Sequence, residues 1–267
     1  MFKMKNLLYL AFVGLLLTSC SEYQKTLNKG TVEEQYAMAS KMYESKKYNK
    51  ALSLFEKVTP TYRGKPQMER IQFMVAQSNF NTKNYDLAGY YFDRFTQNYP
   101  KSSKKEEAAF LSAYSYKLAS PAFSLDQTDT HKALNSFQSF IDTYPASSRL
   151  AEANKHYQEI RYKLQKKAFE IGKIYYTTAE SDPSGRNYTA SIQAFDNMLE
   201  EYLGSDFKEE ALYYRLKASH DLAIKSTPRR KEQRIKDAIK AYEKLKRNFP
   251  KSKYLEDSNK MLATLEN

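Results

Sequence analysis

The feature of this sequence that most limits its fold is a run of an aromatic residue, proline and serine that returns along the chain. It reads "NYPKSS" at 98–103, "TYPASS" at 143–148 and "NFPKSK" at 248–253. Each proline follows an aromatic residue by eight positions and an alanine by twelve, as in Ala88, Phe92 and Pro100; Ala133, Phe137 and Pro145; and Ala238, Tyr242 and Pro250. Two looser copies keep the small and aromatic pair: Ser191 and Phe195 before "EYLGS", which has Leu203 in the proline slot, and Ala51 and Phe55 in "YNKALSLFEKV". Copies at fixed offsets predict a protein built from five repeats.

The residue types of this repeat predict pairs of antiparallel helices. A small side chain lets two helices approach closely, and the aromatic side chain four positions later lies on the same face and fills the space between them. Proline ends the second helix because it has no N–H to donate and restricts the residue before it. The next helix would begin at a capping box, which the spacing predicts for Ser103 with Glu106, Thr31 with Glu34 and Asp206 with Glu209.

Composition and periodicity favour helices throughout. The 267 residues include seven glycines and eight prolines, too few for a chain that turns between many strands. Apolar residues recur at helical spacing from Leu150 to Ile174, which predicts one long helix joining two halves, with Gly172 where a neighbouring helix crosses. We therefore predict an all-α fold, a right-handed solenoid of five tetratricopeptide-like helix pairs plus a C-terminal capping helix. Repeats 1–3 would occupy 31–146, and repeats 4–5 with the cap would occupy 147–267.

The first residues of the chain differ from the rest. Lys3 and Lys5 precede an apolar stretch at 7–17 that is too short to cross a bilayer, so we predict a signal peptide at 1–19.

A lipid anchor is expected directly after this signal. The run "LTSC" at 17–20 resembles the lipobox of bacterial lipoproteins, in which the cysteine thiol carries the lipid. Cys20 is the one cysteine of the chain, so an intramolecular disulfide is excluded. We expect a lipidated tether at 20–30 that holds the body at a membrane through acyl chains such as palmitate. Ser21, rather than Asp, implies transfer to the outer membrane under the lipoprotein sorting rule. The alternative is a secretory signal with a chance cysteine.

The order of these features resembles one family, BamD, the lipoprotein subunit of the outer-membrane β-barrel assembly machinery. The resemblance covers almost everything after Cys20 and rests on the lipobox, the long fourth leading helix, and the runs "ASPAFSLDQTDTHKALNSF", "YDLAGYYFDRFTQNYP" and "TYPASSRLAEA". It implies an outer-membrane, lipid-anchored scaffold with its body in the periplasm. The implied partners are a BamA-like barrel-forming subunit, docked by the C-terminal repeats, other assembly lipoproteins, and unfolded outer-membrane proteins with an aromatic C-terminal signal. "EYLGS" departs from the family pattern, so partner contacts of the fourth repeat are not carried over.

First helices of tetratricopeptide repeats line a face suited to peptides, and here that face is aromatic and polar. The predicted peptide groove consists of Tyr36, Ser40 and Tyr43 in the first repeat, Phe73, Gln77 and Phe80 in the second, and Phe110, Tyr114 and Lys117 in the third. The alternative is that these aromatic side chains pack against the adjacent repeat.

Basic residues are concentrated near the C-terminus. The formal net charge is +12, and residues 226–253 hold eleven Lys or Arg against three acidic residues. We predict a surface for anionic lipid headgroups or an acidic partner at Arg229, Arg230, Lys231, Arg234, Lys246 and Arg247. A solvated helix face is the alternative. Nucleic acid is not expected, because a secreted lipoprotein rarely meets it and no aromatic and glycine binding signature accompanies the charge.

Catalysis is not expected. His131, His156 and His220 are far apart in sequence, with no paired His or Cys, so neither a metal site nor a cofactor is predicted. Ser102 and Lys105 fit S-x-x-K but lie in a predicted turn. Two other binding functions stay open. A periplasmic repeat scaffold for glycan import is disfavoured by the absence of tryptophan, and a scaffold for envelope division remains an alternative.

Overall fold

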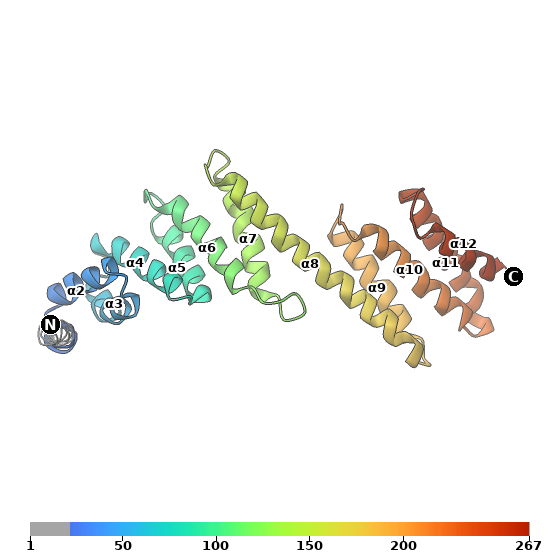
Figure 1. Cartoon of the computed structure of the whole chain (residues 1–267), viewed down its shortest axis with the longest axis horizontal. Helices are drawn as coiled ribbons and strands as arrows, with labels where there is room; N and C mark the ends of the chain where they lie inside the picture. The colour runs from blue at the N-terminus through green and yellow to red at the C-terminus, as the bar shows by residue number, and fades with distance from the viewer. Residues whose placement is uncertain (1–21, 267) are drawn as a thin grey trace, which may run out of the picture. The chain divides into compact units, whose positions relative to one another are not determined.

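The structure is a computed structural model that describes residues 22–266, and all regular secondary structure within that range is helical (Figure 1). Five helix pairs follow one another and a last helix closes the series, which confirms the predicted all-α class and its tetratricopeptide-like helix pairs. The helices are α2 (Val32–Glu44), α3 (Tyr48–Tyr62), α4 (Gln67–Asn81), α5 (Tyr85–Asn98), α6 (Lys105–Ala119), α7 (Thr128–Thr143), α8 (Leu150–Thr178), α9 (Arg186–Glu201), α10 (Lys208–Ile224), α11 (Pro228–Asn248) and α12 (Leu255–Glu266), with a 3₁₀ turn at Ala179–Ser181.

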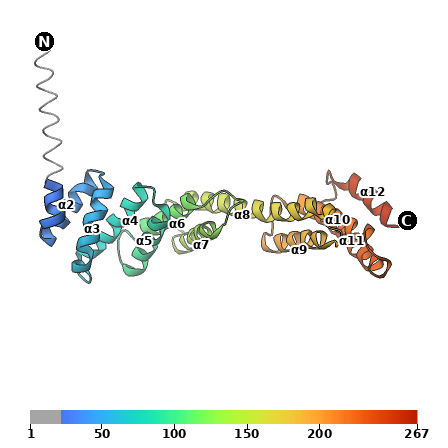
Figure 2. The ribbon, with the colours of Figure 1, turned by 90° about the horizontal axis from the view of Figure 1, so that it is seen from below.

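The chain divides into two compact units, and α8 contributes to both. Unit 1 extends to Ser120 and includes Thr128–Tyr157, and unit 2 consists of Pro121–Gln127 and the chain from Gln158 onward. The sequence predicted a domain boundary before the long helix, whereas the two compact units meet within α8, between Tyr157 and Gln158. In unit 2, α9 lies alongside the later turns of α8 in both ribbon views (Figures 1 and 2).

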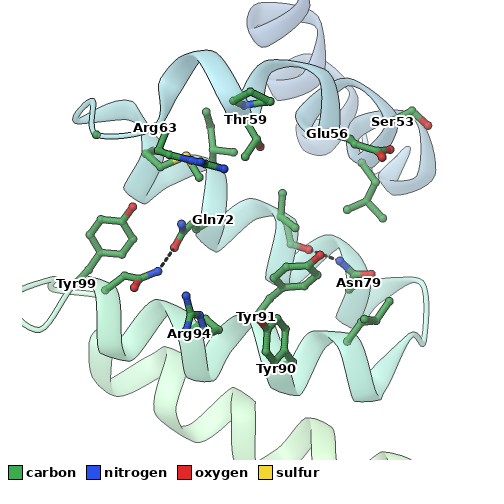
Figure 3. A pocket seen from close by; sticks show the side chains of 18 of the residues that line it. Ser53, Glu56, Thr59, Arg63, Gln72, Asn79, Tyr90, Tyr91, Arg94 and Tyr99 are labelled. Carbon is green, nitrogen blue, oxygen red and sulfur yellow. Dashed lines mark hydrogen bonds between the residues drawn. The ribbon is translucent and has the colours of Figure 1, made fainter.

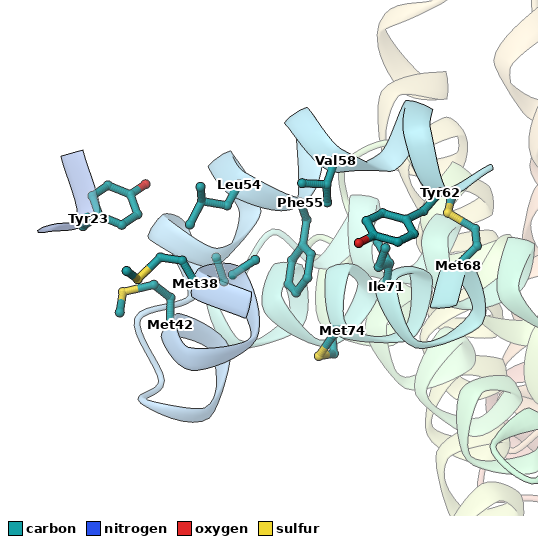
Figure 4. Close-up of a cluster of buried hydrophobic side chains, with 12 residues drawn as sticks. Tyr23, Met38, Met42, Leu54, Phe55, Val58, Tyr62, Met68, Ile71 and Met74 are labelled. Atoms are coloured by element: carbon teal, nitrogen blue, oxygen red, sulfur yellow. The ribbon is translucent and has the colours of Figure 1, made fainter. Parts of the chain in front are cut away.

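The small and aromatic positions of the repeat form the cores of the helix pairs. Ala88 and Phe92 are completely buried, as are the equivalent pairs Ala51 and Phe55, Ala133 and Phe137, and Ser191 and Phe195. The first core cluster joins Ala51 and Phe55 to methionines of α2 and α4 (Figure 4).

Two glycines lie where neighbouring helices approach each other closely. A Cβ on Gly89 would lie 2.7 Å from the Tyr116 ring, and a Cβ on Gly172 would lie 2.7 Å from the Phe195 ring. A serine of the crossing helix donates to each glycine carbonyl. Ser112 donates to Gly89 and Ser191 donates to Gly172, both at 2.9 Å. Gly172 therefore has the predicted role of admitting a neighbouring helix, and Gly89 has the same role in unit 1.

The repeated aromatic and serine run is a double turn. In "NYPKSS" the Ser102 N–H donates to the Tyr99 carbonyl at 3.1 Å, and the Ser102 hydroxyl accepts from the Lys104 N–H at 3.0 Å. The Ser102 carbonyl then accepts from the Lys105 N–H at 3.1 Å, which starts α6. The same three bonds recur around Ser147, Ser205 and Ser252.

Of the three predicted capping boxes, one is present, and this turn replaces the other two. The prediction for Thr31 with Glu34 is confirmed, since Thr31 accepts from the Glu34 N–H and Glu34 accepts from the Thr31 N–H. The predictions for Ser103 and Asp206 are wrong, because α6 and α10 begin after Lys104 and Phe207 without a side-chain cap. The serine hydroxyl two residues earlier already satisfies the first backbone donor.

The segment expected to be a tether is partly folded. Residues 22–29 are helical, and Tyr23 is buried in the first core cluster with its hydroxyl donating to the Lys50 carbonyl at 3.2 Å (Figure 4). The open end of the first helix pair leaves apolar surface that this turn covers, so the described part of 20–30 belongs to the body. Cys20 and the predicted signal peptide lie outside the described residues.

Candidate functional site

The predicted first-helix face of unit 1 is a series of side chains that contact one another. Tyr43 on α2 donates from its hydroxyl to the Gln77 side-chain carbonyl on α4. Burial raises the pKa of the Tyr43 hydroxyl, so it stays protonated and remains a donor. Phe80 on α4 packs against Tyr114 on α6, with ring centroids 6.2 Å apart. The face therefore links successive repeats.

The structure also places the remaining residues of the predicted groove. Tyr36 packs on Tyr62 at 5.2 Å, and the hydroxyl of Ser40 is enclosed without a hydrogen-bond partner among the described residues. Phe73 packs edge-on against core rings of α5. Phe110 is 2% exposed, so it is a core side chain rather than a groove residue.

Lys117 and Tyr114 both meet His156 in the first turns of α8. The Lys117 ammonium lies 2.5 Å from His156 Nδ1, and the Tyr114 ring lies 5.2 Å from the imidazole. Together these contacts favour the alternative weighed for this face, in which its aromatic side chains pack between repeats.

Unit 1 has a hollow between the second helices α3 and α5, with α4 as its floor (Figure 3). We call it the aromatic groove. Its volume is about 1030 Å³. Leu87, Tyr90 and Tyr91 of α5 are 49%, 50% and 37% exposed, and they form its apolar part. Gln72 of the floor accepts from Asn98 at 3.1 Å.

Two arginines and one glutamate, Glu56 of α3, are the charged residues that line the aromatic groove. Arg63, just after α3, and Arg94 on α5 both line it, and neither forms an ion pair within residues 22–266 (Figure 3). A guanidinium with free N–H donors can bind a carboxylate through two parallel hydrogen bonds. The groove can therefore hold an apolar or aromatic segment and pair with a carboxylate on it.

This groove was not predicted from the sequence, although a signal for it was present. In "YDLAGYYFDRF", Ala88, Phe92 and Phe95 follow the buried face of α5. Leu87, Tyr90 and Tyr91 fall outside that register, and a helix places such residues toward solvent. Exposed aromatic residues beside a buried row indicate a binding surface.

Unit 2 has an exposed apolar surface on α8. Ile171, Ile174 and Tyr175 are spaced three and four residues apart, so they share one face, and each is at least 39% exposed. Ile171 and Ile174 both belong to the apolar series that predicts the long helix. Phe169 and Gly172, which lie on the opposite side, are the buried residues.

A loop extends this apolar surface. The loop at 121–127 carries part of the "LDQTD" run, and two lysines of α8 hold it. Lys163 donates to the Pro121 carbonyl at 3.0 Å, and Lys167 donates to the Leu125 carbonyl. The Leu125 side chain is exposed, and Ile171 lies one helical turn beyond Lys167. We call Leu125, Ile171, Ile174 and Tyr175 the α8 apolar surface.

The six predicted basic residues all belong to α11, but they point in different directions. Arg229, Arg230 and Lys231 are exposed in its first turn. Arg234 is turned toward the fold and donates to the Ser226 hydroxyl at 2.6 Å. Lys246 lies over the Tyr242 ring at 5.6 Å, and Arg247 is exposed.

Two other kinds of feature are absent from residues 22–266. No helix in that part of the chain is both long and apolar enough to cross a membrane. The same residues bring together no group of three or more His, Cys, Asp or Glu side chains that could hold a metal ion.

Consecutive helix pairs that are joined by the same kind of turn and carry open grooves define a tetratricopeptide scaffold. Accordingly, a tetratricopeptide repeat model matches residues 229–252. The YfiO outer membrane lipoprotein model matches residues 28–234, most of the chain, and the chain belongs to that family. This agrees with the resemblance to BamD. No individual curated protein matches the chain. The protein is thus an outer membrane lipoprotein scaffold of a family not known for catalysis.

Proposed function

We propose that this scaffold acts in the assembly of outer-membrane β-barrel proteins. It is anchored by lipid on Cys20, with its body in the periplasm. It binds segments of unfolded barrel proteins in unit 1 and the barrel-forming subunit in unit 2, and it works with other assembly lipoproteins. Membership of the outer membrane lipoprotein family and the repeat fold support this role.

The observation that carries the proposal is the chemistry of the aromatic groove. An unfolded barrel protein that ends in an aromatic residue presents a ring and a terminal carboxylate close together. Leu87, Tyr90 and Tyr91 offer apolar surface to the ring, and Arg63 and Arg94 offer donors to the carboxylate. Binding through a ring and one ion pair leaves the rest of the segment unrestricted, which suits a scaffold with many clients.

Peptide binding tests this assignment. A fluorescein-labelled peptide that ends in phenylalanine should bind the protein more tightly as the free acid than as the amide, measured by fluorescence anisotropy. Tyr90→Ser and Arg94→Ala should weaken binding, and Arg94→Ala should also remove the preference for the free acid. Tyr175→Ser is the matched control, since Tyr175 is a similarly exposed tyrosine in unit 2. If Phe80→Ala abolished binding and Tyr90→Ser did not, the predicted first-helix face would be the site instead.

The α8 apolar surface supports docking of the barrel-forming subunit on unit 2. Exposed apolar side chains in a contiguous patch indicate a protein interface. A photo-crosslinker in place of Ile174 should capture a large outer-membrane barrel protein with periplasmic domains. The same crosslinker at Lys47, an exposed position of unit 1, should not. Capture of glycan-import or envelope-division proteins alone would favour the alternative functions.

The lipid anchor has a separate test. Cys20→Ser should leave the leader uncleaved and remove the lipid, which mass spectrometry of the intact protein detects. Wild-type protein that lacked a mass increment for acyl chains would contradict the anchor.

A further inference from the structure

The outer side of α11 carries a straight row of cations. Arg229, Lys236, Lys240, Lys244 and Arg247 follow one another at spacings of seven, four, four and three residues, so they share one helix face. We call this row the basic stripe. At 1.5 Å per residue it is about 27 Å long. The face opposite, formed by Ala238, Ala241, Tyr242 and Leu245, is buried against the rest of unit 2.

Few acidic residues in the described part of the chain neutralise the basic stripe. Within the described residues, Lys236 pairs with Glu232 at 2.7 Å, and no other cation of the stripe forms an ion pair. The segment 226–253 retains an excess of eight positive charges, from eleven basic and three acidic residues. The first turn of α11 also has no acidic residue and three basic ones, although the positive end of a helix dipole disfavours cations there. This charge does not stabilise α11 and is available to an anionic partner.

The shape and composition of the basic stripe distinguish between anionic partners. No large apolar side chain of α11 is exposed, whereas protein interfaces are rich in aromatic and apolar contacts and poor in charge at their centre. A hollow of about 320 Å³ lies beside α11. Lys240 is the one residue of the stripe that lines it, and Asp237 lines it too. A straight row of cations without apolar anchors or a groove fits a plane of phosphate groups, because headgroup attraction needs only basic residues near the surface.

We propose that the basic stripe of α11 binds the surface of a bilayer that contains anionic phospholipids. This contact is additional to the lipid on Cys20 and independent of the proposed peptide and subunit sites. A lipid chain fixes only the N-terminal end of the protein to the membrane. An electrostatic contact at α11 gives unit 2 a membrane attachment of its own, one that weakens as salt rises.

Vesicle flotation tests the proposal on the lipid-free mature chain, residues 21–267, which contains every described residue. The chain should float with vesicles of phosphatidylcholine containing phosphatidylglycerol and stay behind with phosphatidylcholine alone. Arg229→Glu, Lys240→Glu and Arg247→Glu combined should weaken binding on the order of a hundredfold, given about 1 kcal/mol for each basic residue at the surface. Circular dichroism should show an unchanged fold, because all three side chains are exposed.

A matched control separates a local surface from net charge. Lys47→Glu, Lys101→Glu and Lys155→Glu combined change the net charge equally, at exposed positions of unit 1. This variant should bind vesicles within about threefold of wild type, since salt screens distant charges. Three results would overturn the proposal: equal losses in both variants, wild-type binding that ignores lipid charge, or no wild-type binding at low salt. The peptide experiment on the aromatic groove does not depend on the outcome.

Discussion

The aromatic groove of unit 1 and the hollow beside α11 in unit 2 occupy equivalent places in their repeats but differ in what they offer a ligand. Each lies between two second helices over a first helix: α3 and α5 over α4, and α9 and α11 over α10. The first has a volume of about 1030 Å³ and the second about 320 Å³.

Their arginines show the difference most clearly. In unit 1, Arg94 lines the groove without an ion pair among the described residues. In unit 2, Arg215 donates to both carboxylate oxygens of Asp196, at 2.7 and 3.0 Å. One guanidinium is free for a ligand, and the other joins α9 to α10. The repeat therefore fixes where a groove can form, and a few surface residues decide whether it binds or is closed.

Core substitutions should give the largest effects, and they test whether the two units unfold separately. Phe92 and Phe195 occupy the same repeat position in the two units and are completely buried. Each change to alanine should cost about 3–5 kcal/mol of unfolding free energy through lost contacts and a cavity. If the units open separately, hydrogen exchange will quicken mainly in the unit that carries the substitution. Equal acceleration throughout residues 22–266 would show one cooperative unit instead.

Removing the arginines should separate binding from stability. Arg215→Ala leaves Asp196 without its partly buried partner and should lower the free energy of unfolding by about 1–3 kcal/mol. Arg94→Ala should change stability by less than about 0.5 kcal/mol, as expected of a surface residue without such a partner, yet weaken peptide binding. Thermal unfolding and anisotropy measure the two effects. A large loss of stability from Arg94→Ala would mean that the aromatic groove needs this arginine for folding.

Acid should loosen the turn before α9 in unit 2. Hydrogen bonds from Ser184 and from the Asn187 N–H hold the pKa of Asp182 at about 2. Because this lies below the unfolded value of about 3.9, the carboxylate stabilises the turn above about pH 4, and that stabilisation is lost as pH falls toward 2. Asp182→Asn should remove the pH dependence of the Asn187 amide signal in an NMR titration. The turn before α6 uses the Ser102 hydroxyl, which does not titrate, and its amides should move less.

Serine substitutions should give the smallest effect. Ser102→Ala and Ser205→Ala each remove one hydroxyl that accepts from a backbone N–H at the start of a helix. Each should cost about 0.5–1 kcal/mol, as for a helix-capping hydroxyl. Ser205 also donates to the buried Gln165 at 2.9 Å, so its loss should cost more than that of Ser102 in chemical denaturation. Equal losses would show that the bond to Gln165 contributes nothing net.

Much of the fold was predictable because it depends on short-range rules. Helix ends follow from the aromatic and proline run, and core positions follow from small and aromatic residues four apart. The choice between Ser102 and Ser103 as the capping residue was not predictable from capping spacing, because it depends on the preceding turn to Tyr99. The burial of Tyr23 was missed for a different reason: it depends on apolar surface left open by α2 and α3.

The candidate sites were less predictable, because they depend on three helices at once. First-helix residues such as Tyr43 and Phe80 were assigned to a groove, yet each of them contacts a side chain of the next repeat. The aromatic groove needs the spacing between α3 and α5, which neither helix encodes alone. The basic surface of α11 was the exception. A row of cations on one helix can be found from the sequence, because it does not depend on a neighbouring helix.

The three hydrogen bonds that define the double turn between repeats all join residues of the turn itself. "NYPKS" and "EYLGS" form it equally well, although Pro100 is replaced by Leu203 and Lys101 by Gly204, whose φ is +79°. A connector of this kind behaves as an interchangeable part. A chain that uses it can gain or lose a whole repeat without a new junction.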